Sequence, residues 1–259
     1  MARVLIPLPD HDFDVTEVSV PWKLLRDAGH DVVFATETGG FAPAADQRLI
    51  AGVIFGQLGA AKEALAFYAS LHKDASFNSP KSWEKVDVSH YDALLLPGGH
   101  APRMRQYLAN ETLHQQVSRF WALDRPVAAI CHGVIVLARS IDQSTGRSVI
   151  AQTRTTCLPK YMERSAYALT AWKLGRYYRT YPTYVEDEVR AVLQAPGRQF
   201  EVGPRTLTRR GSATDDTGAF VVEDGRYVSA RWPGDAYLFA RRLIERLAEL
   251  PRTSGSLRS

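Results

Sequence analysis

The chain has 259 residues, of which 45% are hydrophobic and 23% are charged. These proportions are typical of globular proteins and argue against a disordered, fibrous or membrane-embedded class. The length allows one large α/β domain or two small domains, and we expect one. The formal net charge is +4 at pH 7, but acidic residues neighbour the basic ones along the chain, so we expect no nucleic-acid partner.

Membrane insertion and secretion are also disfavoured. No run approaches the roughly 18 apolar residues that span a bilayer, and the start, MARVLIPLPDHD, has too short an apolar stretch for a secretory signal. We therefore expect no membrane partner and a cytoplasmic protein. The only cysteines, Cys131 and Cys157, cannot build a disulfide framework or a four-thiolate zinc site, and both should be free thiols.

The first 40 residues follow the pattern of a β-α-β unit. Residues 3–8 (RVLIPL) indicate a buried strand, a polar loop follows, and apolar periodicity up to Gly29 predicts a helix. Residues 31–36 (DVVFAT) indicate a second strand, which predicts a parallel sheet. The less regular segment 41–90, with a helical patch at 60–71, is interpreted as an insertion that could cover the site.

Two further strands end in residues suited to chemistry. Residues 91–97 (YDALLLP) predict a strand that ends in GGH at 98–100, and Asn110 should cap the next helix. Residues 126–130 (PVAAI) predict a fully apolar strand, and an apolar helix follows CHG at 131–133. The cysteine of that motif therefore falls at the carboxyl end of a central strand, where open α/β sheets bind ligands.

The remaining residues complete an α/β pattern with a central, mostly parallel sheet between layers of helices. One domain is expected over residues 1–250, and a flexible tail over 251–259. The other expected elements are a strand at 148–158, an aromatic-rich helix at 159–180, a hairpin of 220–223 with 227–230, and a helix at 233–250.

Cys131 is the main candidate for catalysis. Gly133 lets the backbone turn tightly enough to push the thiol outward, and the start of a helix favours the thiolate. The alternative is a small buried hydrophobic residue at a strand end. All seven histidines lie at or before position 132, so a base for this thiol cannot come from later in the chain.

Three other features could assist this thiol, and each has a plain structural alternative. His132 could take the thiol proton or simply bond to the backbone. Glu17, in the first turn of the first helix, could be a buried acid or only a residue favoured by the helix dipole. Gly98 and Gly99 could bind an oxyanion with their N–H groups or form an ordinary turn.

Together these residues resemble the ThiJ/PfpI superfamily, the class I glutamine amidotransferase-like proteins, and most of all its glyoxalase III/chaperone branch. The resemblance implies a flavodoxin-like three-layer α/β sandwich and a homodimer. It rests on Glu17 with Pro21, AGHDV at 28–32, LLLPGGH at 94–100, AAICHG at 128–133 and ARWPGDA at 230–236.

The resemblance also implies roles. Cys131 would be the nucleophile, His132 its partner and Glu17 the acid bonded to the thiol. Glu163, in CLPKYMER, would orient His132, although the family more often has Asp there. The N–H groups of Gly99 and His132 would form the oxyanion site, and the residues expected to bind an oxyanion or the substrate are Gly98, Gly99 and His100.

No cofactor and no metal are expected. The zinc site that is common in the glyoxalase III/chaperone branch needs a histidine that the segment after Glu17, VSVPWKLLRDAG, lacks. The histidine count likewise excludes the late histidine of a glutaminase triad.

Three functions remain open. The first is a cofactor-free enzyme that acts on small reactive carbonyls, as in the conversion of methylglyoxal to D-lactate or a related deglycase or hydratase reaction. The second is a cysteine hydrolase of amide or peptide-like bonds. The third is a stress-responsive holdase chaperone in which Cys131 only senses oxidation.

Overall fold

A seven-stranded sheet forms the centre of the computed structural model, which describes residues 1–52, 59–179, 181–206 and 209–250. The tail expected at 251–259 lies outside the described residues. The strands of the sheet are β1 (Arg3–Pro7), β3 (Asp31–Thr36), β5 (Lys81–Ser82), β6 (Ala93–Leu96), β7 (Val127–Ile130), β10 (Val221–Asp224) and β11 (Tyr227–Ala230).

The strand order is β10-β11-β7-β6-β1-β3-β5, and every pairing is parallel except that of β10 with β11. The central strands are runs of apolar residues that are buried on both faces, as expected for parallel strands between layers of helices. The mostly parallel α/β sandwich predicted from the sequence is confirmed, and so is the β10–β11 hairpin.

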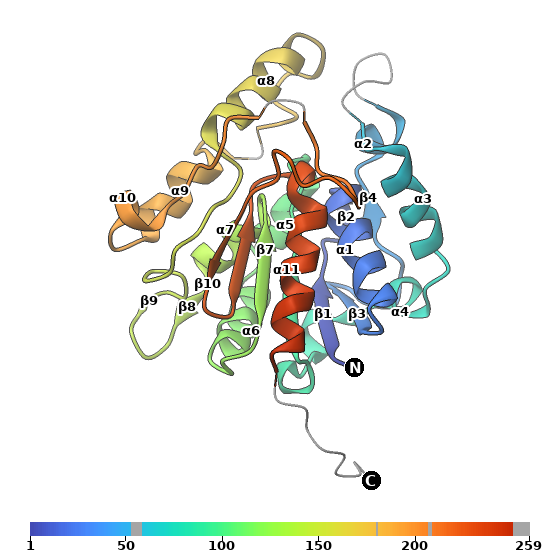
Figure 1. Ribbon diagram of the computed structural model, residues 1–259, viewed down its shortest axis with the longest axis vertical. Coiled ribbons are helices and arrows are strands. Elements are labelled where there is room, and N and C mark those ends of the chain that lie inside the picture. The colour runs from blue at the N-terminus through green and yellow to red at the C-terminus, as the bar shows by residue number, and fades with distance from the viewer. Residues whose placement is uncertain (53–58, 180, 207–208, 251–259) are drawn as a thin grey trace.

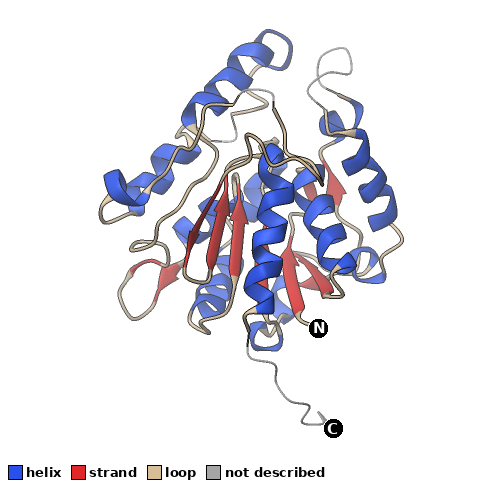
Figure 2. Cartoon of the chain, in the orientation of Figure 1, coloured by secondary structure: helices blue, strands red, loops and turns tan. Residues whose placement is uncertain are grey.

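Helices cover both faces of this sheet (Figures 1 and 2). One face carries α1 (Val15–Asp27) and α11 (Ala236–Ala248), with α3 (Lys62–Leu71) packed outside α1. The other carries α5 (Arg105–Leu108), α6 (Glu111–Trp121) and α7 (Gly133–Arg139). Among the described helices, none is long and apolar enough to cross a membrane.

Three helices follow the central strands and lie beyond the sheet, in yellow to orange in Figure 1: α8 (Lys160–Leu174), α9 (Val185–Val192) and α10 (Pro196–Gln199). The segment 41–90 also contains structure, including α3, and part of it (53–58) lies outside the described residues. Other short elements of this segment are β4 (Ala44–Ala45), α2 (Gln47–Ala51) and α4 (Ala75–Asn78). Elsewhere in the chain, the short strands are β2 (His11–Phe13), β8 (Ile141–Asp142) and β9 (Arg147–Ser148). Single 3-10 turns lie at Trp83–Lys85, Val88–His90, Pro102–Met104 and Pro233–Asp235.

Side-chain caps determine where two of the helices begin. The carboxylate of Asp14 accepts hydrogen bonds from the N–H groups of Thr16 and Glu17 at 2.8 and 3.1 Å, which caps α1. Asn110 caps α6 by accepting from the N–H of Leu113 at 2.9 Å, as predicted. These local bonds fix the point at which the chain enters each helix, and the first of them places Glu17 beside the strand ends.

The strand expected at 148–158 is wrong. Only its first residue belongs to β9, and the rest runs as turns, with a single bridge between Thr155 and Phe200. Buried N–H groups there bond outside any ladder: that of Thr156, for example, donates to Ser229 Oγ at 3.0 Å. The segment is apolar because it is buried, and a short apolar run does not by itself distinguish a strand from a buried loop.

The two late helices are shorter than expected. The helix expected at 159–180 ends at Leu174, because Gly175 has a φ of 56°, outside the helical region. The helix expected at 233–250 begins with a 3-10 turn at Pro233–Asp235 before α11.

Candidate active site

Cys131 occupies the turn between β7 and α7 with a φ of 57°, a value that residues other than glycine rarely adopt. The strand-to-helix turn expected there is present. A Cβ at Gly133 would lie 2.1 Å from the carbonyl oxygen of Leu96, so only glycine allows α7 to begin this close to the end of β6. The surrounding fold therefore holds the thiol in a strained conformation.

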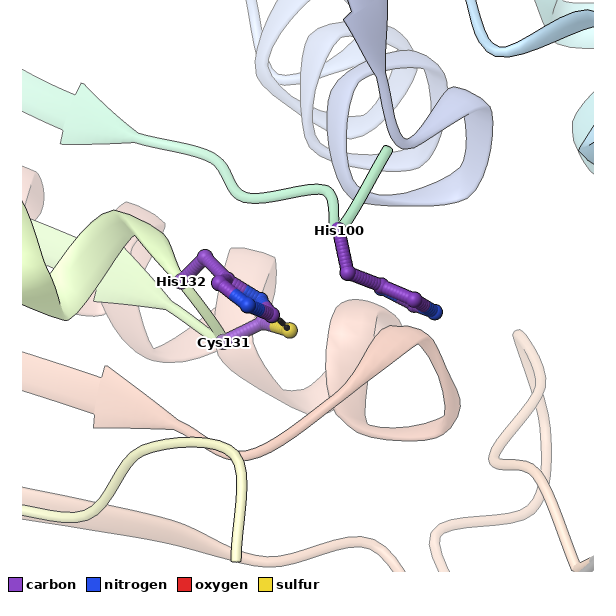
Figure 3. A group of neighbouring side chains, drawn as sticks. All are labelled: His100, Cys131 and His132. Carbon is purple, nitrogen blue, oxygen red and sulfur yellow. Dashed lines mark hydrogen bonds between the residues drawn. The ribbon is translucent and has the colours of Figure 1, made fainter. Parts of the chain in front are cut away.

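His132 lies directly beside the thiol. Its Nδ1 is 3.5 Å from Cys131 Sγ, and the tautomer of the ring decides which group donates (Figure 3). Burial lowers the pKa of His132 well below its usual range, and the neighbouring His100 and Arg139 lower it further. The imidazole is therefore neutral at pH 7 and able to accept a proton from the thiol.

The thiol itself is fully buried, which raises the pKa of Cys131 well above its usual value. Negative charge on Glu17 and on Asp14 would raise this pKa further, and the N–H of His132 opposes both effects. The sequence led us to expect a thiolate favoured by the helix start. The structure instead disfavours the thiolate, first through burial of the thiol and then through any negative charge on Glu17.

Glu17 is a fully buried carboxyl group on α1. Its Oε2 accepts a hydrogen bond from the N–H of Gly98 at 2.8 Å, and its Oε1 has no hydrogen-bond partner among the described residues. The thiol of Cys131 is close enough for each group to shift the pKa of the other. Burial, followed by the charge of Asp14, raises the pKa of Glu17 well above its usual value. Burial therefore favours the protonated, uncharged form of Glu17.

Asp14 is a site residue that the sequence reasoning missed. It is buried at the start of α1, and burial raises its pKa to about 6 despite two backbone hydrogen bonds. Its charge acts on both Glu17 and Cys131. The available signal was a helix-capping aspartate three residues before Glu17.

The GGH segment at 98–100, after β6, lies beside the thiol, and each of its three residues makes different contacts. The N–H of Gly98 donates to Glu17, so its role differs from the oxyanion contact expected. A Cβ at Gly98 would lie 2.7 Å from His132 N and 3.0 Å from Cys131 Cβ, which explains the glycine. Gly99 has a φ of 151° and no room for a side chain. The ring of His100 stacks on that of His132, with centroids 5.6 Å apart.

Glu163 is not hydrogen-bonded to His132 in the described part of the chain. Its carboxylate accepts from the N–H of Val185 at 3.0 Å and pairs with Arg179 at 3.3 Å, which ties α8 to the start of α9. Burial raises the pKa of Glu163 to about 7. The structure thus gives Glu163 contacts other than the expected one with His132, although it lines the same cavity as Cys131.

One group of side chains among the described residues could hold a metal ion. His100, Cys131 and His132 each offer a ligand atom, and these atoms lie within 4.8 Å of one another (Figure 3). Two imidazoles and a thiolate suit a soft cation such as Zn²⁺. A cation bound there would occupy the thiol.

A cavity of about 540 Å³ lies at the carboxyl ends of the strands, and the buried Cys131 is one of its lining residues. One wall is α8, which contributes Met162, Ala166 and Leu169. Leu49 and Ala60, from the segment expected to cover the site, line it as well. The thiol of Cys131 therefore lines this cavity, while His132 contacts the thiol and Glu17 lies close to it without lining the cavity.

Comparison with known proteins identifies relatives over most of the chain. The family model described as ThiJ/PfpI family-like matches residues 8–204. A protein of Pyrococcus abyssi named a deglycase is 27% identical over 246 residues, which cover 95% of this chain and 99% of the relative. The protein/nucleic acid deglycase 2 of Escherichia coli is 30% identical over 152 residues, which cover 58% of this chain and 72% of the relative.

A solved structure supports the fold independently. Glyoxalase III from Candida albicans has a TM-score of 0.66 to this chain at 18% sequence identity, with 95% of this chain and 97% of that chain covered. At this level of identity the similarity concerns the fold alone, and it agrees with the flavodoxin-like α/β sandwich expected from the sequence.

Proposed function

The chain belongs to the ThiJ/PfpI family, and on that premise we propose that it is a cofactor-free enzyme in which the Cys131 thiol attacks small reactive carbonyl compounds. The observation that carries the proposal is the contact of 3.5 Å between His132 Nδ1 and the sulfur of Cys131, a residue that lines the cavity. The names of the relatives, two deglycases and a glyoxalase III, support carbonyl chemistry.

The first step is addition of sulfur to the aldehyde carbon of methylglyoxal. The thiol proton passes to neutral His132 and from there to the carbonyl oxygen, which gives a hemithioacetal. Glu17, protonated and behind the thiol, stabilises negative charge on the sulfur during this step. Because Nδ1 is 3.5 Å from the sulfur, a carbon bonded to that sulfur lies within its reach.

The second step is an internal oxidation and reduction. His132 takes the proton from the former aldehyde carbon and returns it to the neighbouring carbon through an enediol, while the hydroxyl proton moves between the two oxygens. The product is a lactate thioester of Cys131. Water then cleaves the carbon–sulfur bond, which releases D-lactate and restores the thiol proton, so that the overall reaction consumes one water molecule.

A cysteine hydrolase of amide bonds is less well supported. That chemistry requires an acid that orients the histidine, and Glu163 bonds instead to Arg179 and to the N–H of Val185.

The deciding experiment follows methylglyoxal loss and D-lactate formation without glutathione, in the wild type and in Cys131→Ala. We expect lactate from the wild type and none from the variant. Cys157→Ala is the matched control, because this second buried thiol does not line the cavity. Equal turnover in Cys131→Ala would contradict the proposal. Undiminished protection of a client protein by Cys131→Ala, with no turnover of any carbonyl by the wild type, would favour the holdase.

We further propose that the enzyme acts in the cytoplasm as a homodimer, without a nucleic-acid partner. The family resemblance supports the dimer, and the interleaved charges of the sequence support the lack of nucleic-acid binding. Sedimentation equilibrium of the full chain tests the dimer directly.

A further inference from the structure

The cavity is much larger than the small carbonyl compound that the family relationship suggests. Methylglyoxal has five non-hydrogen atoms and, at roughly the 30 Å³ that a water molecule occupies in the liquid for each of them, fills about 150 Å³. The cavity has about 540 Å³, which is in the range of pockets that enclose ligands several times larger. A substrate matched to this space has a substantial body beyond its reactive carbonyl.

The walls indicate that this body is apolar. Met162, Ala166 and Leu169 of α8 line one side, and Leu158, Trp232 and Pro233 also line the cavity. Leu169 is 58% exposed although it lines the cavity, so an apolar surface continues from the interior to the outside. Burial of an aromatic ring or a branched chain against apolar walls contributes much more binding free energy than burial of a methyl group.

A cation also lies on the wall. Arg210 lines the cavity, with its guanidinium carbon 5.6 Å from the centre of the Trp232 ring. It makes no ion pair and no hydrogen bond with the described residues, yet its charge lowers the pKa of Asp14, which lies near the thiol. The backbone beside it is anchored, because the N–H of Gly211 donates to the carbonyl of Gly234 at 2.7 Å.

Two buried donors in the same cavity lack a partner. The hydroxyl of Tyr178 and the Nε1 of Trp232 are buried, and neither has a hydrogen-bond partner among the described residues. The Tyr178 ring packs against that of His100, with centroids 4.6 Å apart, which places it beside the reacting groups. A buried donor without a partner costs stability.

We infer that the substrate of this site is a reactive carbonyl compound with an apolar body of about six to twelve non-hydrogen atoms and a carboxylate or similar anion that pairs with Arg210. This inference rests on the proposed carbonyl reaction at Cys131 and adds the substrate class. The carbonyl lies at the thiol, the body lies along α8, and the anion faces the guanidinium group.

The test compares initial rates with three 2-oxoaldehydes, measured before arginine modification sets in: methylglyoxal, phenylglyoxal and 4-carboxyphenylglyoxal. We expect kcat/KM for phenylglyoxal to exceed that for methylglyoxal by at least about tenfold, because the ring is buried against apolar walls. We expect a further gain of about tenfold from the carboxylate. Equal or better use of methylglyoxal would overturn the inferred size and polarity of the substrate.

The role of Arg210 is tested by the ratio of kcat/KM between the carboxylated and the neutral ring. In Arg210→Gln this ratio should fall about tenfold, close to one. Arg209→Gln is the matched control, since Arg209 is exposed, pairs with Asp215 and does not line the cavity. An unchanged ratio in Arg210→Gln, or the same decrease in both variants, would overturn the anion contact.

A binding measurement separates this inference from the proposed reaction. Phenylacetate carries the ring and the anion but no reactive carbonyl, and calorimetry measures its binding to Cys131→Ala. We expect binding that Arg210→Gln weakens about tenfold, and no binding of acetate. If no oxoaldehyde is turned over but phenylacetate binds in this way, the carbonyl reaction is wrong and the ligand class stands. Absence of phenylacetate binding overturns the ligand class whatever the turnover.

Discussion

The protonation state of Glu17 affects the pKa of the Cys131 thiol, and Glu17→Gln tests that state. In the structure Oε2 accepts from the Gly98 N–H at 2.8 Å, and burial raises the pKa of Glu17 well above its usual value. Glutamine keeps an oxygen that can accept this hydrogen bond, so the variant should fold. What changes is that an acid able to give up its proton becomes an amide that cannot.

The two protonation states predict different results. Two like unit charges about 4 to 5 Å apart, at an effective dielectric constant of about 20, repel by about 3 to 4 kcal/mol, so an ionised carboxylate beside the sulfur would raise the thiol pKa by about 2 to 3 units. If Glu17 is ionised, its replacement by glutamine therefore lowers the thiol pKa by about that amount. If Glu17 is protonated, as its burial favours, the pKa of Cys131 rises by less than about 1 unit, because an amide is a weaker donor than a carboxylic acid.

The assay is the pH dependence of alkylation by iodoacetamide between about pH 5 and pH 10. Both proteins carry Cys157→Ala, so that only Cys131 reacts. We expect nearly superimposed profiles and a decrease in carbonyl turnover in Glu17→Gln, because the amide stabilises charge on the sulfur less well than the carboxylic acid does. A fall of the thiol pKa by two units would show that Glu17 is ionised and would refute the assignment of the proton to it.

Three further predictions concern stability. Gly133→Ala should lower the free energy of unfolding, measured by urea denaturation, by about 3 kcal/mol or more, because the added Cβ would lie 2.1 Å from a carbonyl oxygen of β6. Gly146→Ala is the control: its Cβ would meet nothing within 4 Å, so its positive φ should lower the free energy of unfolding by only about 1 kcal/mol. Equal decreases in the two variants would contradict this. Asp235→Asn should lower the free energy of unfolding by about 3 to 5 kcal/mol, because it leaves the fully buried Arg231 without its counter-charge. Replacement of both residues by apolar ones should lower the free energy of unfolding by less. The pKa of Glu163 is raised to about 7 in the folded protein, so its stabilising contribution is complete below about pH 4.5 and is lost as the pH rises through about 7. Between about pH 4.5 and pH 7 the free energy of unfolding of the wild type should therefore fall by about 3 kcal/mol, and Glu163→Gln should not show this fall. If both proteins have the same pH profile, the carboxyl is not buried as described.

The sheet and the position of the thiol could be predicted from the sequence because both depend on local patterns. Runs such as DVVFAT and PVAAI have the apolar pattern of strands that are buried on both faces. Their alternation with helices favours parallel pairing. The capping role of Asn110 also follows from neighbouring residues alone. The element expected at 148–158 failed because burial, rather than pairing with another strand, explains its apolar residues.

The candidate site was predictable only in part. Cys131, His132 and Glu17 come together as expected because they follow the ends of neighbouring strands or begin the helix beside them. Glu163 was assigned to His132 by its position in the sequence, and the fold gives it to Arg179 and Val185 instead, because α8 carries it away toward α9.

The sequence by itself determined which residues lie at the carboxyl edge of a parallel sheet, since short-range periodicity, glycines and caps decide that. Only the tertiary structure decided the protonation of the thiol, its acid and its histidine, because pKa values depend on burial and on charges brought together by distant segments. The same holds for the cavity. Its walls come from α8, the loop before it and the segment around Trp232, and no local pattern records that these surfaces face one another.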